Sequence, residues 1–241
     1  MIITEYKPIG MTCGELIKKY KNEKKAYVGI LDPMAHGLLT ILTDNDISKM
    51  EEYMKKDKIY RFKFIIGTNT DTDDILGIHV LDSKKLSIDL KLLIDCFNNF
   101  PSHYKQKYHA FSAYKPKKKF EGKRKPLWWW LTNGYNVNDI DDIPKRTVKI
   151  YAKKIEKVET VSGDKLQEEF IRRVELIKED KFRKGETIKQ WKEYEFDKTY
   201  NVFNCVVHVS SGFYIRQFVK DISDILGVKL LVIDIERLAI E

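Results

Sequence analysis

The residues 29–39, GILDPMAHGLL, carry the first candidate for chemistry, the carboxylate of Asp32. Pro33 disfavours helix at Asp32 and pre-sets a turn, while Gly29 and Gly37 permit backbone angles that other residues avoid. An aspartate before a proline is also an ordinary turn starter, so Asp32 taken alone is interpreted as structural. The competing interpretation is that Asp32 is a reacting carboxylate, and the rest of the sequence has to separate the two.

Two further side chains could serve such a carboxylate. The segment YRFKFIIG alternates between apolar and polar residues, which predicts a strand that Tyr60 opens on its apolar face. The segment 201–227 runs from an alternating strand through a Ser-Ser-Gly turn into a helix, and Arg216 lies in the first helical turn, one position off the apolar stripe. Arg216 can therefore point into whatever cleft this turn borders. Taken singly, Tyr60 is interpreted as a half-buried strand residue and Arg216 as a solvated residue or a phosphate contact.

Sequence motifs for nucleotide-driven or metal-driven chemistry are absent. The chain contains no GxxxxGK[ST], GxGxxG, HExxH or GxSxG pattern. Its three cysteines, Cys13, Cys96 and Cys205, have no CxxC spacing, so the sequence predicts neither a zinc site nor a disulfide framework. We therefore expect no metal and no cofactor.

The charge distribution favours a polyanionic partner. The net charge is +8, and the segment KPKKKFEGKRK at 115–125 holds six lysines and one arginine against Glu121 alone. Such a run is often only a solvated loop. Here aromatic residues interleave with the lysines and three tryptophans, at 128–130, follow them. Cations that neutralise phosphates beside rings that stack on bases are typical of binding to looped or single-stranded RNA.

The whole chain, 1–241, is predicted to be one α/β (α+β) domain with a mixed, mostly antiparallel sheet flanked by helices. No apolar run of about 18 residues and no secretory signal is present, so a cytoplasmic protein without membrane contact is expected, a nuclear one being left open. Periodicity and turn signals predict the following elements: a capping box at 12–15, a helix at 46–56, strands at 60–66 and 78–81 around an acidic turn at 68–77, a helix at 87–97, a basic and aromatic loop at 101–135, a strand at 147–158, and a charged, partly helical insertion at 164–198.

Six segments in chain order resemble motifs of the TruB family of tRNA pseudouridine synthases. GILDPMAHGLL resembles the family's catalytic motif, approximately GxLDPxAxGxL. The other five are YKPIGMT at 6–12, KIYRFKFIIGTNTDTDDILG at 58–77, SAYK at 112–115, SSGFYIRQFVKDI at 210–222 and IERLAI at 235–240. The resemblance spans residues 6–240 and leaves only the insertion at 164–198 outside it.

The resemblance implies a pseudouridine synthase fold with a central RNA-binding cleft. It implies an isomerase that moves the C1′ bond of a uridine from N1 to C5, usually at uridine 55 in the T loop of tRNA. Asp32 would be the catalytic carboxylate, Tyr60 the ring stacked on the base and Arg216 the partner of Asp32. A carboxylate could attack the ribose, attack the uracil or remove a sugar proton, and the sequence leaves these routes open. Further residues expected to contact or support the RNA substrate are Lys7, Pro8, Tyr27, Tyr214, Lys115, Lys117, Lys118 and Lys119.

The sequence departs from the family pattern in four places, one of which is Trp128, near the position where the family has a tyrosine after its SAxK motif. Tyr27 stands where the family has a histidine, and His36 stands where it usually has threonine. The chain ends at Glu241 without the family's C-terminal PUA domain, so RNA binding is expected to depend more on the segment 115–125, on the insertion or on a partner. We expect a monomer that acts on the T arm of tRNA. Two alternatives stay open: a noncatalytic RNA-binding or RNA-folding protein on the same scaffold, and a synthase redirected to another RNA.

Overall fold

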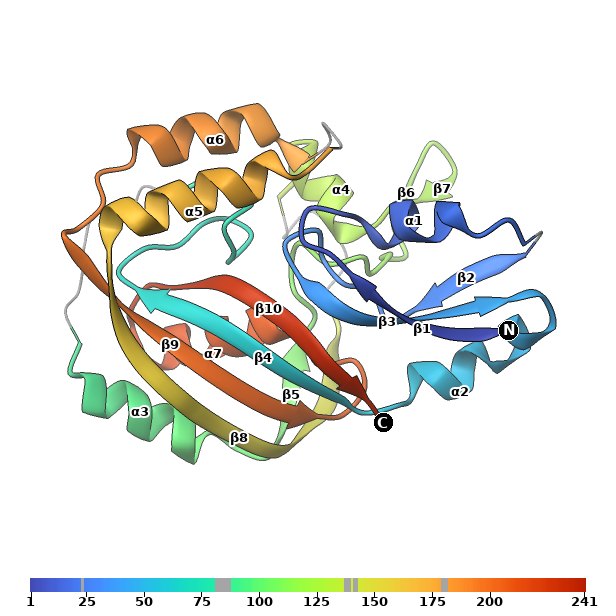
Figure 1. The fold of residues 1–241 in the computed structure, drawn as a ribbon, viewed down its shortest axis with the longest axis horizontal. Helices are drawn as coiled ribbons and strands as arrows, with labels where there is room; N and C mark the ends of the chain where they lie inside the picture. Colours follow the sequence, from blue (N-terminus) through green and yellow to red (C-terminus); the bar gives the residue numbers. More distant parts are fainter. Residues whose placement is uncertain (23, 81–87, 137–139, 141–142, 179–181) are drawn as a thin grey trace.

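An eight-stranded sheet organises the computed structural model, which describes residues 1–241 except 23, 81–87, 137–139, 141–142 and 179–181 (Figure 1). Seven strands follow the order β1-β3-β10-β4-β9-β8-β5, and β2 pairs with β3 beside this path. All pairings are antiparallel except the short contact between β3 and β10. The expected mixed, mostly antiparallel sheet flanked by helices is therefore confirmed.

The strands of the main sheet come from both ends of the chain and are long in its centre. Their bounds are β1 Ile2–Lys7, β2 Lys25–Val28, β3 His36–Thr43, β4 Lys58–Ile66, β5 His103–Lys107, β8 Lys145–Ser162, β9 Thr199–Val209 and β10 Leu230–Ile240. A separate small hairpin pairs β6 Lys119–Phe120 with β7 Lys123–Arg124.

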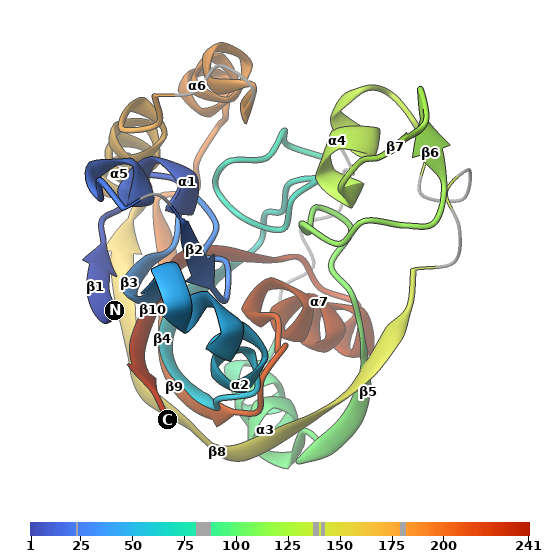
Figure 2. The ribbon, with the colours of Figure 1, turned by 90° about the vertical axis from the view of Figure 1, so that its right-hand side faces the viewer.

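The helices gather at the two ends and inside the curve of this sheet. Their bounds are α1 Cys13–Leu16, α2 Met50–Met54, α3 Leu90–Asn99, α4 Leu127–Thr132, α5 Gly163–Glu175, α6 Lys184–Glu193 and α7 Ile215–Leu226. Figure 1 shows α5 and α6 together at one end and α1 and α2 at the other, and Figure 2 shows α7 inside the curve of the sheet. In the described part of the chain, no helix is long and apolar enough to span a bilayer.

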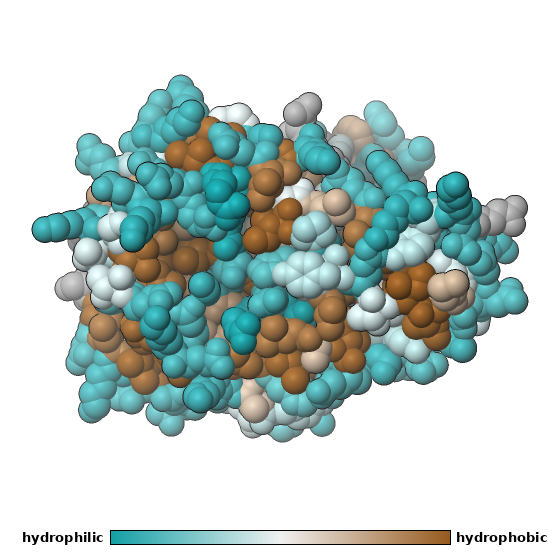
Figure 3. All heavy atoms as spheres, in the orientation of Figure 1, coloured by the Kyte–Doolittle hydropathy of each residue, from teal (hydrophilic) through white to brown (hydrophobic). Residues whose placement is uncertain are grey.

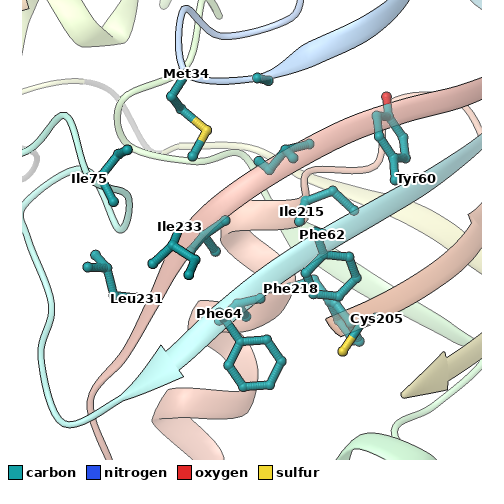
Figure 4. Packing of buried hydrophobic residues seen from close by; sticks show 14 of the residues in the cluster. Met34, Tyr60, Phe62, Phe64, Ile75, Cys205, Ile215, Phe218, Leu231 and Ile233 are labelled. Carbon is teal, nitrogen blue, oxygen red and sulfur yellow. The ribbon is translucent and has the colours of Figure 1, made fainter. Parts of the chain in front are cut away.

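The core lies between α7 and the central strands. The predicted alternation along β4 buries Tyr60, Phe62 and Phe64, and the ring of Phe64 stacks on Phe203 of β9 at 4.9 Å between centroids. Phe218 of α7 meets Phe62 edge to face at 6.2 Å, as the close view of the cluster shows (Figure 4). This packing fixes α7, and with it Arg216, against the sheet.

Several local predictions are confirmed. Thr12 and Glu15 form the capping box, in which Glu15 N donates to Thr12 Oγ1 at 3.1 Å and Thr12 N donates to Glu15 Oε2 at 2.7 Å. Gly227 ends α7 in the left-handed conformation, with φ at 65°. The insertion at 164–198 is largely helical, as α5 and α6, and its apolar side chains Leu166, Phe170, Val174 and Ile177 are buried in the main core.

Other predictions were wrong in detail. The second strand expected at 78–81 is reduced to a single bridge between Thr70 and His79, because the acidic turn bonds mainly within itself, and residue 81 lies outside the described residues. The loop expected at 101–135 contains β5, which pairs with β8, and the β6–β7 hairpin and α4, whose aromatic residues belong to a second small core around Trp130. The helix expected at 46–56 begins as a 3₁₀ turn over 44–49 before α2.

Figure 3 shows that hydrophilic side chains cover most of the visible face, with hydrophobic patches between them.

Strands β3 and β10 approach each other closely at Gly37, shortly after the turn that carries Asp32. At the parallel contact between β3 and β10, Gly37 lies opposite Arg237 with φ at 109°. A Cβ at residue 37 would lie 2.3 Å from the carbonyl oxygen of Arg237, so only glycine allows the two backbones to approach this closely.

Candidate active site

Asp32 lies in the turn between β2 and β3. The turn is closed by a hydrogen bond from Ala35 N to Asp32 O at 3.0 Å and held from outside by Gly10 N, which donates to Pro33 O at 2.9 Å. Leu31 N, just before Asp32, donates to Cys13 Sγ at 3.3 Å. The side chain of Asp32 is 35% exposed, so a fixed backbone presents a carboxylate that a substrate could reach.

The guanidinium of Arg216 lies between two carboxylates. Its NH2 is 2.8 Å from Asp32 Oδ2 and its NH1 is 3.2 Å from Asp74 Oδ2. NH1 also donates to Thr72 O at 2.9 Å, and NH2 donates to Phe111 O at 3.2 Å. Because the arginine side chain is only 6% exposed, these four oxygens replace the water that its charge would otherwise bind.

Burial and charge oppose one another at this pair of acids and one base. Burial alone would lower the pKa of Arg216, but the carboxylates of Asp32, Asp74 and Asp73 outweigh it and raise the pKa. For Asp74, burial raises the pKa to about 6, against the opposite effect of Arg216. The Asp74 carboxylate accepts from Thr72 Oγ1 at 2.7 Å and from Leu76 N at 2.9 Å, so it is held inside the acidic turn.

Asp32 and Arg216 both line a cavity of about 370 Å³. Its wall combines six separated parts of the chain: the β2–β3 turn, residues 12–15 at α1, the acidic turn, the stretch from Phe111 to Thr132, residues 182–183 between α5 and α6, and Arg216 of α7. Tyr27 also lines it, and burial raises the pKa of that phenol. The cavity is apolar over much of its lining and includes a few charged side chains, as expected of a ligand site.

Tyr60 is not among the residues that line this cavity. Its side chain is buried in β4, and its hydroxyl accepts a hydrogen bond from Arg237 Nε at 3.1 Å. Figure 4 shows the hydroxyl of Tyr60 directed away from the ring of Phe62. Stacking of Tyr60 on a base therefore stays a prediction.

Arg237 connects Tyr60 to the turn that carries Asp32. The guanidinium lies 5.4 Å from the centroid of the Tyr60 ring and donates to the carbonyls of Gly29 at 3.0 Å, Ile30 at 3.4 Å and Leu38 at 3.2 Å. Arg237 was part of the motif at 235–240, but its role could not be inferred there. The contact depends on the β4–β10 pairing, which places Arg237 opposite Tyr60.

Lys7 holds the N-terminal loop that meets the turn carrying Asp32. Its ammonium is fully buried and donates to Pro8 O at 3.1 Å and to Met11 O at 2.7 Å. Burial lowers the pKa of Lys7 to about 8, while the charges of Cys13 and Asp32 act to raise it. Lys7 thus holds the N-terminal loop, whose Gly10 N donates to Pro33 O in the turn that carries Asp32, while contact of Lys7 and Pro8 with the RNA substrate stays a prediction.

A family model for "TruB family pseudouridylate synthase (N terminal domain)" matches residues 18–167 of the chain. This match covers more than half of the sequence. The chain belongs to the TruB family.

Curated relatives are named tRNA pseudouridine synthase B. The protein of Thermotoga maritima is 30% identical over 154 residues, which cover 62% of this chain and 46% of the relative. The protein of Vibrio cholerae is 26% identical over 225 residues, which cover 92% of this chain and 56% of the relative. The chain therefore spans about half the length of the curated relatives it matches.

Solved structures support the fold. A structure described as an H/ACA RNP bound to a substrate RNA containing 2'-deoxyuridine aligns over 99% of this chain and 47% of the other, with a TM-score of 0.53 and 15% identity. A Cbf5-Nop10-Gar1 complex aligns over 99% of this chain and 48% of the other, with a TM-score of 0.52 and 17% identity. The expected pseudouridine synthase fold is thus confirmed.

Among the TruB motifs, the one at 210–222 also contributes Tyr214. This tyrosine caps α7, its ring lies 5.5 Å from that of Tyr108, and its backbone exchanges hydrogen bonds with Gln106 at 2.8 and 3.0 Å. Burial raises its pKa to about 12. Tyr214 does not line the cavity, so its contact with substrate stays a prediction.

The basic segment at 115–125 follows Ala113 and precedes Trp128, which both line the cavity, but none of its own residues does. Trp128 of α4 lines the cavity, whereas Trp130 is buried in the small second core. The lysines 115, 117 and 119 are exposed, while the ammonium of Lys118 lies 5.5 Å from the ring centroid of Trp130. The interleaving of lysine and aromatic residues therefore serves partly to build this core.

Two groups in the wall were missed by the sequence reasoning. Asp74 lay within the acidic motif, where neighbouring acids gave no sign of which would be buried beside Arg216. Residues 182–183 lay in the insertion, to which no function could be assigned.

Proposed function

We propose that this chain converts uridine to pseudouridine in RNA, with uridine 55 in the T loop of tRNA as substrate and Asp32 as the catalytic carboxylate. The observation that carries the proposal is the buried guanidinium of Arg216, 2.8 Å from an accessible carboxylate at the wall of a cavity large enough for a nucleotide base.

The difference in exposure between the two carboxylates supports different roles for them. The side chain of Asp74 is 3% exposed and bonded within its turn, whereas that of Asp32 is 35% exposed. Asp32 is therefore the acid that reaches a substrate. Asp74 orients the Arg216 guanidinium and balances part of its positive charge. Arg216 in turn pairs with Asp32 at 2.8 Å and holds its carboxylate in place while a polyanion approaches.

The reaction needs only groups that the site and the substrate supply. The C1′–N1 bond of the uridine breaks, the detached uracil turns, a C1′–C5 bond forms, and the proton on C5 leaves while N1 gains one. Asp32 acts on the sugar or the base during bond breakage. The nucleotide has to leave its stack to enter the cavity, and the exposed lysines at 115, 117 and 119 are proposed to bind the phosphates of the opened loop.

The decisive experiment compares wild type with Asp32→Asn on an unmodified T stem-loop and an unmodified tRNA. Pseudouridine is mapped by base-specific chemistry, and Asp95→Asn, on an exposed position of α3, serves as the matched control. We expect full product from wild type and control and none from Asp32→Asn. Full product from Asp32→Asn would refute the catalytic assignment.

RNA binding and the mapping of pseudouridine in cellular RNA separate the alternative functions. RNA binding without any product would identify a noncatalytic RNA-binding protein on this scaffold. Product on other RNAs, found by mapping pseudouridine across cellular RNA with and without the gene, but none on tRNA, would identify a redirected synthase.

A further inference from the structure

The insertion reaches the active site through its tip. Phe182 and Arg183, between α5 and α6, line the same cavity as Asp32 and Arg216. We propose that Arg183 is a positioning residue for Arg216, which makes the helix pair α5–α6 part of the catalytic framework. This inference rests on the proposed function of the site.

Arg183 contacts two segments that each supply a carbonyl to Arg216. Its NH1 and NH2 pair with both oxygens of Asp71, at 2.7 and 3.1 Å. The residue after Asp71 is Thr72, whose carbonyl accepts from Arg216. The same Arg183 guanidinium lies 5.5 Å from the ring centroid of Phe111, whose carbonyl is the other main-chain acceptor of Arg216. The Arg183 side chain thus contacts both segments whose carbonyls, of Thr72 and Phe111, accept hydrogen bonds from Arg216, and helps to hold them in position.

Helix α6 strengthens the grip on the acidic turn. Trp191 Nε1 donates to Ile75 O at 2.8 Å, and Thr187 Oγ1 donates to Leu76 O at 3.2 Å. Gln190 Oε1 accepts from the backbone of His79 at 2.6 Å. These bonds hold residues 75–79, which directly follow Asp74, so α6 helps to fix the position of that carboxylate. The insertion therefore supports the turn along its length, and Arg183 supports it beside Thr72.

The contacts favour a positioning role over direct RNA binding. Two of the three guanidinium nitrogens of Arg183 are paired with one carboxylate, which neutralises its charge, and the side chain is 24% exposed. A free phosphate-binding arginine would present its fork to solvent. Arg172, by contrast, lies on α5 with a side chain that is 58% exposed, and it forms a comparable two-point pair with Glu169 at 2.7 and 2.8 Å. It is the matched control.

The test uses Arg183→Ala, Arg183→Lys and the control Arg172→Ala in the full chain. Single-turnover pseudouridine formation and RNA affinity are measured together with the Nε–H NMR signal of Arg216, assigned by its loss in Arg216→Lys. For Arg183→Ala we expect a rate on the order of 10- to 100-fold lower, the cost of misplacing a reacting group slightly. RNA affinity should stay unchanged and the Arg216 signal should shift. Arg183→Lys should be equally slow, because lysine cannot form the two-point pair. Arg172→Ala should match wild type.

Each other outcome decides against the inference. An unchanged rate in Arg183→Ala, or a loss of affinity equal to the loss of rate, would overturn it, the latter by assigning Arg183 to RNA contact. If Arg183→Ala does not fold, Asp71→Asn breaks the same pair with one atom exchanged and is held to the same expectations. A wild type without product on any RNA would refute the proposed function instead. In that case an unshifted Arg216 signal in Arg183→Ala would still overturn the positioning role.

Discussion

Protonation of Asp74 should make the stability of the fold depend on pH in an unusual direction. Burial raises the pKa of this carboxyl from an ordinary 3.8 to about 6, so the folded state holds its proton more tightly than the unfolded chain. The stabilisation is fully present below pH 3.8 and is lost as the pH rises through about 6. A shift of roughly two pKa units at 1.36 kcal/mol each corresponds to about 3 kcal/mol of unfolding free energy.

The substitution Asp74→Asn removes this titration while keeping an oxygen that can accept from Leu76 N. We measure the free energy of unfolding by urea denaturation of wild type and Asp74→Asn at intervals between about pH 3.5 and 7. Other carboxyls titrate in both proteins and cancel in the difference. The stability of wild type relative to the variant should fall by about 3 kcal/mol across this range. Parallel curves would refute the account of Asp74 as a buried acid with a raised pKa.

The rate of pseudouridine formation should rise over the same pH range in which this stabilisation is lost. Only the ionised form of Asp74 forms a salt bridge with Arg216, so pseudouridine formation by wild type should rise as the pH passes about 6. Single-turnover rates on a T stem-loop between about pH 5 and 8 report this limb. Asp74→Asn should be slower, and its profile should lack the limb that belongs to Asp74. The same limb in the variant would assign it to another group.

Three further substitutions test the framework and the RNA surface. Arg237→Lys should lower the free energy of unfolding in urea by about 2 kcal/mol, because the three donors of an ammonium leave at least one of the four oxygens that Arg237 serves without a partner; wild-type stability would show that these bonds are dispensable. Gly37→Ala should cost about 3 kcal/mol more in thermal unfolding than Gly67→Ala, which has a similar positive φ but no atom within 4 Å of the added Cβ; equal losses would exclude the steric argument. Glutamates at 117–119 should weaken RNA binding and flatten its salt dependence by about one unit of slope per lost phosphate contact, whereas Lys91→Glu on α3 should not; an unchanged slope removes this segment from the RNA surface.

The parts of the site that lie within one local motif could be predicted from the sequence. Asp32 stands in a turn because glycine and proline dictate one, and Arg216 stands in the first turn of α7 because the helix begins just before it. The one-position offset of Arg216 from the apolar stripe correctly indicated that it would point into a cleft. Local spacing and turn chemistry are sufficient for such placements.

The parts that depend on long-range pairing could not be predicted. Arg237 meets Tyr60 only because β10 pairs with β4 in one register, across 177 positions of sequence. Arg183 meets Asp71 because α5 and α6 fold back over the acidic turn, 112 positions away. In a segment where acidic and basic residues are mixed without a regular pattern, the sequence does not indicate which charged side chain will form a long-range ion pair.

The cations around Asp32 divide into two kinds with different responses to salt. Lys7, Arg216 and Arg237 are buried and bonded to main-chain or carboxylate oxygens, so dissolved ions screen their charges much less than those of exposed lysines. The lysines of the basic segment are largely exposed, and their attraction for phosphates falls with ionic strength. Raising the salt should therefore weaken RNA binding while leaving the single-turnover rate at saturating RNA nearly constant. A rate that fell with salt even at saturation would contradict this division, because it would mean that the exposed lysines act in the chemical step.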